Sequence, residues 1–313
     1  MLRLILSRVG MLVLLIWIVS LAVFGLTLLI PGDPTLTLLG DNATPDQIAS
    51  LRVALGLNDP FFVRYGHWFW GVLHGDLGTS LFNSYSVADA IGSRIWVTVS
   101  LVVGALIISL VAGTIIGVIA GSRPGSIADR VLLFLSSVGI ALPNFWLGIL
   151  LVTLFGVTFK LFPTGGYIPF SQDPAQWFAH MTLPIITLAL GGAAEVARQA
   201  RASIIDTLQL DFIRTLHAKG VKPRTILLKH ALRSALIPVV TVAGLQVSRL
   251  FGLSVLIEAV FSLPGIGTLL IKAVFDRDIP MVQGTVLLAT VVVVVVNLLV
   301  DLAYGWLNPK AAV

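Results

Sequence analysis

Apolar residues along this chain of 313 residues gather in six long runs, which are separated by shorter polar stretches. About 20 apolar residues cross the hydrocarbon core of a bilayer, and backbone groups in lipid must be hydrogen-bonded within the chain. Each run therefore predicts a membrane-spanning helix, since a barrel strand has only about ten alternating residues. The six predicted spans are 9–30, 96–121, 131–159, 181–198, 235–257 and 284–304.

The first run has a second interpretation as a secretory signal, because Arg3 and Arg8 precede it. Its apolar core exceeds the roughly 7–15 residues of a signal peptide, and IPGDP after it has no small-x-small cleavage site. We therefore expect a retained span.

The segment 31–95 is the most polar part of the chain. Thr44 can cap a helix that begins at Pro45, because its hydroxyl accepts from free amides of the first turn and proline fits the first helical position. Gly56 can end this helix, and a second helix is predicted over 60–73. The aromatic run HWFW in that helix offers a binding surface or interfacial anchors, and nearness to a span favours anchors.

The segment between the fourth and fifth runs is strongly basic. Ile205, Leu208, Phe212 and Leu216 recur at helical spacing. They predict a short amphipathic helix over about 205–220, which Gly220 ends in a left-handed cap before Lys222-Pro223 starts the next helix. Three interpretations remain open: positive charge that only orients the spans, a helix on anionic lipid, or a helix that docks into another protein.

Composition supports the membrane assignment. Hydrophobic residues are 57% and charged residues 11%, against about 45–50% and about 25% in soluble domains. With a cytoplasmic N-terminus, thirteen of the 20 Lys and Arg residues fall in inside segments, so both termini are predicted to be cytoplasmic. This topology largely explains the net charge of +5, and no nucleic-acid partner is expected because the basic residues crowd one short loop.

Patterns typical of catalysis and metal binding are missing from the sequence. It contains no G-x-x-x-x-G-K-[ST] phosphate loop, no H-E-x-x-H and no G-x-S-x-G. Cysteine is absent and the five histidines are scattered, so no metal site is expected. We therefore predict a protein with no catalytic residues and no cofactor of its own.

Three residues inside the runs are candidates for a translocation path: Arg249, Pro143 and Asn144. Arg249 lies about eleven residues past Pro238, hence roughly 16 Å into the fifth span, where a charge is costly and often functional. It either attracts a substrate carboxylate or pairs with an acid on a neighbouring helix. Pro143, followed by Asn144, should bend the third span, and the bend either forms part of a gate or packs against another span. Glu195 is expected to pair locally with Arg198 or Gln199.

Five stretches, in order along the chain, resemble the inner-membrane permease subunits of ATP-binding-cassette importers, in the dipeptide and oligopeptide branch. They are IPGDP, LGLNDPFFVRYGHWFWGVLHGDLGTSL, ALPNFWLGILL, DFIRTLHAKGV with KHALRSALIP, and FSLPGIGTLLIKAVFDRDIPMVQG.

The resemblance implies that 211–220 is the coupling helix, which fits a cleft on a cytoplasmic ATPase. The implied contact residues are Asp211, Phe212, Arg214, Leu216, His217, Ala218, Lys219 and Gly220. The importer-wide pattern has a Glu-Ala-Ala start and a later Ile-x-Leu-Pro, whereas this chain has Arg214-Thr215-Leu216 and HALR at 230–233, and keeps only Gly220.

The fold implied is an all-α membrane protein with six spans, cytoplasmic termini, a helical extracytoplasmic segment after the first span and a cytoplasmic coupling helix between spans four and five. Its parts are the tail and first span at 1–30, the extracytoplasmic segment at 31–95 and the permease core at 96–313.

The function implied is peptide import across the bacterial inner membrane, by alternating access, as half of the path. The implied partners are a second homologous permease, two cytoplasmic ATPase domains that bind ATP and magnesium, an extracytoplasmic solute-binding protein and the lipid bilayer. The branch also includes importers of glutathione and nickel chelates. An ion-driven secondary transporter is the alternative, but it predicts inverted repeats, which the sequence lacks. A scaffold or receptor that binds an ATPase without moving solute is the third possibility.

Overall fold

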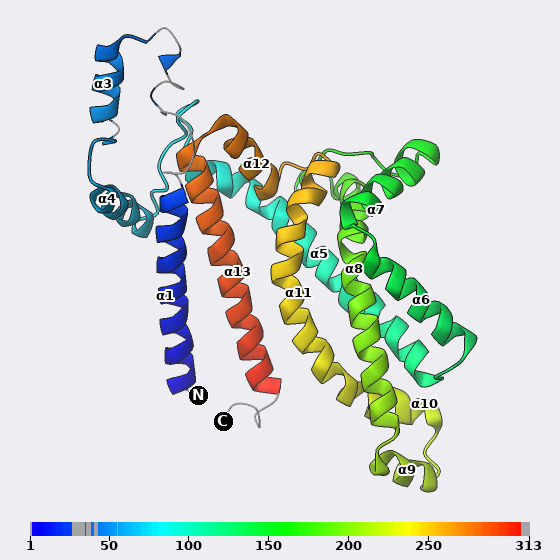
Figure 1. Cartoon of the computed structure of the whole chain (residues 1–313). Helices are drawn as coiled ribbons and strands as arrows, with labels where there is room; N and C mark the ends of the chain where they lie inside the picture. The colour runs from blue at the N-terminus through cyan, green and yellow to red at the C-terminus, as the bar shows by residue number, and fades with distance from the viewer. Residues whose placement is uncertain (1, 27–34, 36–38, 41–42, 55, 308–313) are drawn as a thin grey trace. The chain divides into compact units, whose positions relative to one another are not determined.

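The computed structural model describes residues 2–26, 35, 39–40, 43–54 and 56–307. Regular structure in this part is helical, apart from one isolated bridge between Thr79 and Ser86. The helices, drawn in Figure 1, are α1 (Leu2–Leu26), α3 (Pro45–Ala54), α4 (Phe61–Leu73), α5 (Val87–Ser122), α6 (Ile127–Ala141), α7 (Asn144–Leu151), the π-helix η2 (Val152–Thr158), α8 (Pro174–Leu208), α9 (Asp211–Ala218), α10 (Pro223–Thr225), the π-helix η3 (Ile226–Ala231), α11 (Leu232–Val260), α12 (Ile266–Asp276) and α13 (Ile279–Leu307).

The prediction of an all-helical protein with several membrane spans is confirmed in this coarse form. Four stretches of the described chain are long and apolar enough to cross a bilayer: Val87–Ser122, Pro174–Leu208, Pro238–Val260 and Ile279–Leu298. A fifth candidate is the broken pair formed by Ile127–Ala141 and Asn144–Thr158. The apolar part of α1 within the described residues, Gly10–Gly25, is shorter than a full span.

The bend predicted at Pro143 is confirmed. α6 ends at Ala141, α7 begins at Asn144, and the two helices meet at 104°. Pro143 sits at the N-cap of α7 with an extended backbone. A proline cannot donate the amide that a continuous helix needs and clashes with the preceding turn, so the chain restarts there in a new direction.

The polar segment also folds locally as predicted. The amide of Gln47 donates to Oγ1 of Thr44 at 3.4 Å, and the Thr44 amide donates back to Oε1 of Gln47 at 3.0 Å. This reciprocal capping starts α3 at Pro45. Gly56 takes the left-handed conformation (φ +62°) after α3, and α4 begins one residue later than the predicted Pro60.

The chain divides into two compact units. The first comprises Met1–Trp96 and Gly265–Val294, and the second comprises Val97–Pro264 and Val295–Val313. In the first unit, α4 packs on α1 through aromatic residues: the rings of Tyr65 and Trp68 lie 5.6 and 5.5 Å from the ring of Phe24. Trp68 of the HWFW run therefore serves helix packing, whereas Trp70 is 67% exposed and remains a predicted interfacial anchor.

In the second unit α8 packs against α6, α7 and α11 (Figure 1). α5 approaches α8 closely because Gly113, Gly117 and Gly121 form a four-residue repeat on its facing side. A Cβ atom at Gly117 would lie 2.5 Å from the carbonyl oxygen of Ala197, and one at Gly113 would lie 2.7 Å from that of Ala193. Small residues at this spacing allow membrane helices to pack backbone to backbone.

The single helix predicted over 205–220 is wrong in its first part. Residues 205–208 continue α8, and a separate helix, α9, begins at Asp211 after a break at Gln209 and Leu210. The physical reason lies in tertiary packing. Leu208 packs against a buried cluster that includes Ala231 of η3, so α8 gains buried surface by continuing to that point.

Candidate functional site

The first candidate site is the short helix α9 at the end of α8, which Figure 1 shows in the hairpin between α8 and α11. Gly220 ends it as predicted, with a left-handed φ of +74°. The Gly220 amide donates to the carbonyl of His217 at 2.9 Å, and the next amide donates to the carbonyl of Leu216 at 3.1 Å. A residue with a Cβ atom would be strained at this φ, so glycine fixes the direction in which the chain leaves α9.

α9 has one buried side chain and a broad exposed face. Ile213 is 1% exposed and holds the helix against its own unit, whereas Phe212 is 44% exposed although it is a large apolar side chain. The other predicted contact residues that lie fully on the exposed face are Asp211, Arg214, His217, Ala218, Lys219 and Gly220, and Leu216 is half-buried. An exposed aromatic among charged residues, on a firmly seated helix, is the surface that a protein groove can receive.

The only charge contact on this face of the described chain is weak. Nη1 of Arg214 lies 3.3 Å from Oδ1 of Asp211, and both side chains are largely exposed. Exposed pairs of this kind contribute about 0–1 kcal/mol. Arg214 can therefore exchange Asp211 for an acidic group on a partner at little cost.

The base of the α9 hairpin is held rigidly by a buried cluster. Ile204 of α8, Ala231 of η3 and Ala235 of α11 are each at most 2% exposed and pack together. Side chains from both arms of the hairpin thus share one dry core, which close packing makes stiff. The ends of α8 and α11 between which α9 lies are therefore fixed to each other.

A buried ion pair fixes the turn between α5 and α6 to the same end of α8. Arg201 donates through Nε and Nη2 to the two carboxylate oxygens of Asp129, at 2.5 and 2.8 Å, and Asp129 is 2% exposed. The Gly125 amide also donates to this carboxylate, at 2.8 Å, and the Ser126 hydroxyl caps α6 by accepting from the Asp129 amide. Such bidentate, fully hydrogen-bonded geometry is what a buried charge requires.

The second candidate site is a cavity of about 250 Å³ where α6, α7, α8 and α11 meet. Asn144, Glu195, Arg198, Gln246 and Arg249 supply its polar lining. Nη1 of Arg249 donates to Oε2 of Glu195 at 2.8 Å, and the two side chains are 62% and 37% exposed. The pair thus joins α8 to α11 across an open cavity.

The inner wall of this cavity depends on Gly192 of α8. A Cβ atom there would lie 2.8 Å from Oε1 of Gln246 and 2.8 Å from Oγ of Ser109, so a larger residue would displace these side chains. Nε2 of Gln246 donates to the Gly192 carbonyl at 2.9 Å, while its Oε1 is buried without a hydrogen-bond partner in the described structure.

The structure places the predicted site residues in two groups. The coupling residues lie together on α9 and its C-terminal turn, and Arg249 and Asn144 lie together in the cavity, with Pro143 at the adjacent break. The expected local pair of Glu195 with Arg198 is wrong, because Glu195 faces Arg249 on another helix. The roles of both groups stay predictions.

Several structurally important residues were missed by the sequence interpretation. Ile213 was overlooked because it falls beside the apolar stripe chosen for 205–216, yet it is the buried anchor of α9. The Gly113, Gly117 and Gly121 repeat is visible in GTIIGVIAG as a small-xxx-small pattern. Glu258 of α11, fully buried and accepting from Oγ1 of Thr98 at 2.6 Å, could have been flagged as an acid at the end of an apolar run.

Metal ligands do not gather at either site. Among the residues that the structure describes, no group of three His, Cys, Asp or Glu side chains could hold a metal ion. The side chains present at both sites offer charge pairing, hydrogen bonding and apolar contact.

Comparison with known proteins covers almost the whole chain. Residues 113–313 match the family described as binding-protein-dependent transport system inner membrane component, and residues 1–102 match the N-terminal region of such membrane components. A peptide transport system permease of Brucella abortus (strain 2308) is 41% identical over 310 residues, with 99% of each chain covered. The dipeptide transport system permease of Escherichia coli (strain K12) is 38% identical, with 99% of this chain and 98% of the relative covered.

Solved structures show a similar fold at low identity. A chain of the MetNI methionine ABC transporter in inward-facing conformations superposes with a TM-score of 0.55 and 19% identity, over 69% of this chain and 95% of that one. The family match over 113–313, with relatives about two-fifths identical over the full length, carries the assignment that the fold alone does not. The chain belongs to the family of inner-membrane components of binding-protein-dependent transport systems.

Proposed function

We propose that the chain is the transmembrane permease subunit of an ATP-driven importer of di- or oligopeptides, in which it forms half of the translocation path. The observation that carries this proposal is α9, a short exposed helix seated on the ends of two long apolar helices. Relatives named as peptide and dipeptide permeases support the substrate class.

The proposed topology has six spans and cytoplasmic termini. α1, the broken pair α6 and α7, and the four long helices supply the spans, and the excess of Lys and Arg in the inside segments supports the orientation. Residues 31–95 then form an extracytoplasmic segment after the N-terminal span at 1–30, and 96–313 form the permease core.

We assign ATP hydrolysis, completion of the path and delivery of the substrate to separate partner proteins. Two cytoplasmic ATPase domains bind ATP and magnesium and carry out hydrolysis, a second homologous permease completes the path, and a solute-binding protein delivers the peptide to the extracytoplasmic side. This division agrees with a chain that has no phosphate loop of its own.

Alternating access follows from rigid contact. Closure of the ATPase domains on ATP moves α9, and the dry cluster at its base passes the motion to α8 and α11. Those two helices carry Glu195 and Arg249, so movement between them can open the pair and present Arg249 to a peptide carboxylate. The ion pair also supports the alternative that Arg249 has a purely structural role.

The experiment that tests the function is recovery of partners in mild detergent from the native host. Tagged wild-type chain is expected to co-purify a second permease and a protein with a phosphate loop. Phe212→Asp should lose the ATPase but keep the permease, because Phe212 is exposed on α9 and its replacement leaves the fold intact. Arg123→Asp, an exposed charge change in the turn between α5 and α6, is the matched control.

Recovery of the wild-type chain without any ATPase, or equal ATPase recovery with Phe212→Asp, would contradict the proposal. A stable chain that takes up solute alone would instead indicate the ion-driven alternative.

A further inference from the structure

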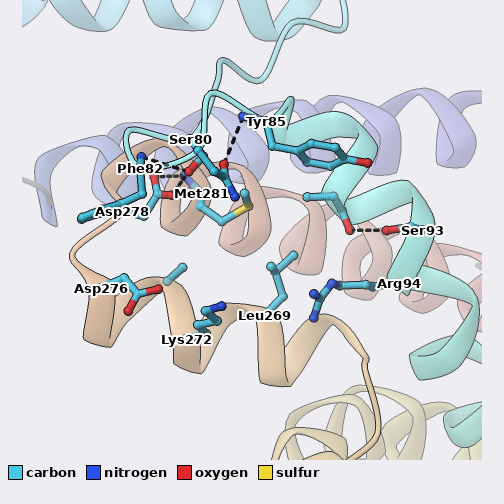
Figure 2. Close-up of a pocket in the computed structure, with 13 residues that line it drawn as sticks. Ser80, Phe82, Tyr85, Ser93, Arg94, Leu269, Lys272, Asp276, Asp278 and Met281 are labelled. Atoms are coloured by element: carbon cyan, nitrogen blue, oxygen red, sulfur yellow. Dashed lines mark hydrogen bonds between the residues drawn. The ribbon is translucent and has the colours of Figure 1, made fainter. Parts of the chain in front are cut away.

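A second cavity, of about 370 Å³, lies in the first unit, remote in sequence from α9 and from the Glu195–Arg249 pair. Its walls come from the loop at 80–85, the start of α5, and α12 with the turn that follows it (Figure 2). Ligand pockets generally occupy about 300–1,000 Å³, so this cavity suits a small ligand.

Two cations from different helices face this space. Arg94 of α5 and Lys272 of α12 line the cavity, on either side of Leu269 in Figure 2. Neither takes part in an ion pair within the described part of the chain. The same holds for Asp276, which lies one turn beyond Lys272 on α12.

The second acid of the cavity, Asp278, does not neutralise these cations. It is 5% exposed, and its carboxylate accepts from Oγ of Ser80 at 2.5 Å and from the amides of Leu81 and Met281, each at 3.4 Å. Asp278 therefore links the loop to the turn after α12, and its hydrogen-bond partners are residues of the cavity wall rather than the two cations. Arg94, Lys272 and Asp276 remain available to a ligand.

The walls are rigid enough to hold these groups in place. The Ser80 amide donates to the Tyr85 carbonyl at 2.9 Å, and the bridge between Thr79 and Ser86 closes the loop. Beneath it, buried apolar side chains from α5, α12 and α13 form one cluster that includes Leu269. In a preorganised pocket the side chains and loops are already ordered, so ligand binding costs little conformational entropy.

The spacing of the charges sets the kind of ligand. Asp276 lies four residues after Lys272 and seven after Leu269, at whose end of α12 Arg94 lies in Figure 2, so roughly 6 and 10 Å along the helix at 1.5 Å per residue. An extended chain of two to three residues spans about 7–11 Å. A free peptide of this length carries a carboxylate at one end and an ammonium at the other, as the two ends of the cavity require.

We propose that this cavity is a binding site for free di- and tripeptides, with the C-terminal carboxylate held by Arg94 and Lys272 and the N-terminal ammonium held by Asp276. An anionic lipid without an ammonium group, such as phosphatidylglycerol, can make the first interaction but not the contact with Asp276. The ligand class rests on the proposed function, whereas the site itself is separate from the cavity that contains Arg249.

Peptide binding to the full chain in phosphatidylcholine nanodiscs tests the proposal. The probes are trialanine, trialanine amide and N-acetyl-trialanine, measured by calorimetry. Amidation should weaken binding roughly ten- to hundredfold, because a charge-assisted contact is lost. Arg94→Gln and Lys272→Gln should weaken trialanine by a similar factor yet leave the already weak amide unchanged, whereas Lys160→Gln, an exposed cation outside the cavity, should change neither.

Asp276→Asn completes the design, since it should weaken trialanine but not N-acetyl-trialanine. Absence of binding to the wild type, equal binding of the amide, or equal losses for all three probes in the variants would overturn the proposal. So would displacement of trialanine by phosphatidylglycerol with no effect of Asp276→Asn, which would identify a lipid site. None of these residues lies on α9, so such a failure leaves the Phe212→Asp result standing.

Discussion

Two ion pairs on α8 differ sharply although Glu195 and Arg201 are only six residues apart on that helix. Arg201 binds Asp129 with two hydrogen bonds, and the carboxylate is 2% exposed and receives a further backbone amide. Glu195 binds Arg249 with a single 2.8 Å contact beside an open cavity. In the first pair the carboxylate is enclosed and accepts three hydrogen bonds, although Arg201 is 24% exposed, whereas both side chains of the second pair face an open cavity.

This difference teaches what each pair can do. Breaking an enclosed pair leaves a buried charge without compensation. Such a pair therefore serves to fix the structure. As part of the proposed translocation path the cavity beside Arg249 is expected to hold water, so the open pair contributes little to stability, because water can replace either partner. We therefore expect the Glu195–Arg249 pair, and not the Asp129–Arg201 pair, to exchange partners during the proposed transport cycle.

The largest effect is expected when the enclosed pair is broken. Arg201→Met should lower the free energy of unfolding by about 3 kcal/mol, because Asp129 would be left buried and unpaired. Denaturant unfolding in detergent micelles measures this loss. The double variant Asp129→Asn with Arg201→Met is the control and should recover part of it. A loss below about 1 kcal/mol in the single variant would remove the distinction between the two pairs.

A smaller effect on stability, with a clear effect on transport, is expected for the open pair. Arg249→Gln should change the free energy of unfolding by less than about 1 kcal/mol. Peptide uptake in proteoliposomes should fall by roughly tenfold, since a charge-assisted contact to the substrate is lost, while subunit assembly is kept.

Glu195→Gln sharpens the test of Arg249. Its effect on uptake should not add to that of Arg249→Gln if the two residues act as one exchangeable pair. Loss of assembly in Arg249→Gln would show that the pair is structural and that its openness has no role in transport.

The smallest effect is expected for the exposed Asp211–Arg214 pair on α9. Arg214→Gln should alter stability by no more than about 0.5 kcal/mol, because both side chains are exposed. Recovery of the ATPase should fall by at most about fivefold, the loss of one rim contact. Arg123→Gln provides the matched control, and a loss as large as that of Phe212→Asp would show that charge, not the apolar contact, seats α9.

Local features of the sequence predicted much of the fold. The apolar runs indicated the long helices, the Thr44 cap and the break at Pro143 are confirmed, and Gly220 ends α9 in a left-handed turn as expected. Each of these features depends on a few consecutive residues. Backbone sterics, missing amides and side-chain caps act over that range and can be read from the order of residues.

Contacts between distant residues could not be predicted in the same way. Glu195 was expected to pair along its own helix, but it faces Arg249, 54 residues later. Likewise nothing within 205–220 indicates that α8 continues to Leu208, because that depends on the cluster around Ala231, or that Ile213 is the buried residue of α9.

The sequence by itself determined that this protein is a bundle of membrane helices with a short basic helix between two of them, since hydrophobic length and charge are properties of segments. Only the tertiary structure decided which charges are enclosed and which are open. Gly117 lets α5 approach α8, and Gly192 leaves room for Gln246. Asp278 accepts a hydrogen bond from Ser80 in the wall of the pocket that Arg94 also lines. The physical reason is that burial and pairing depend on how close helices approach, which no single segment specifies.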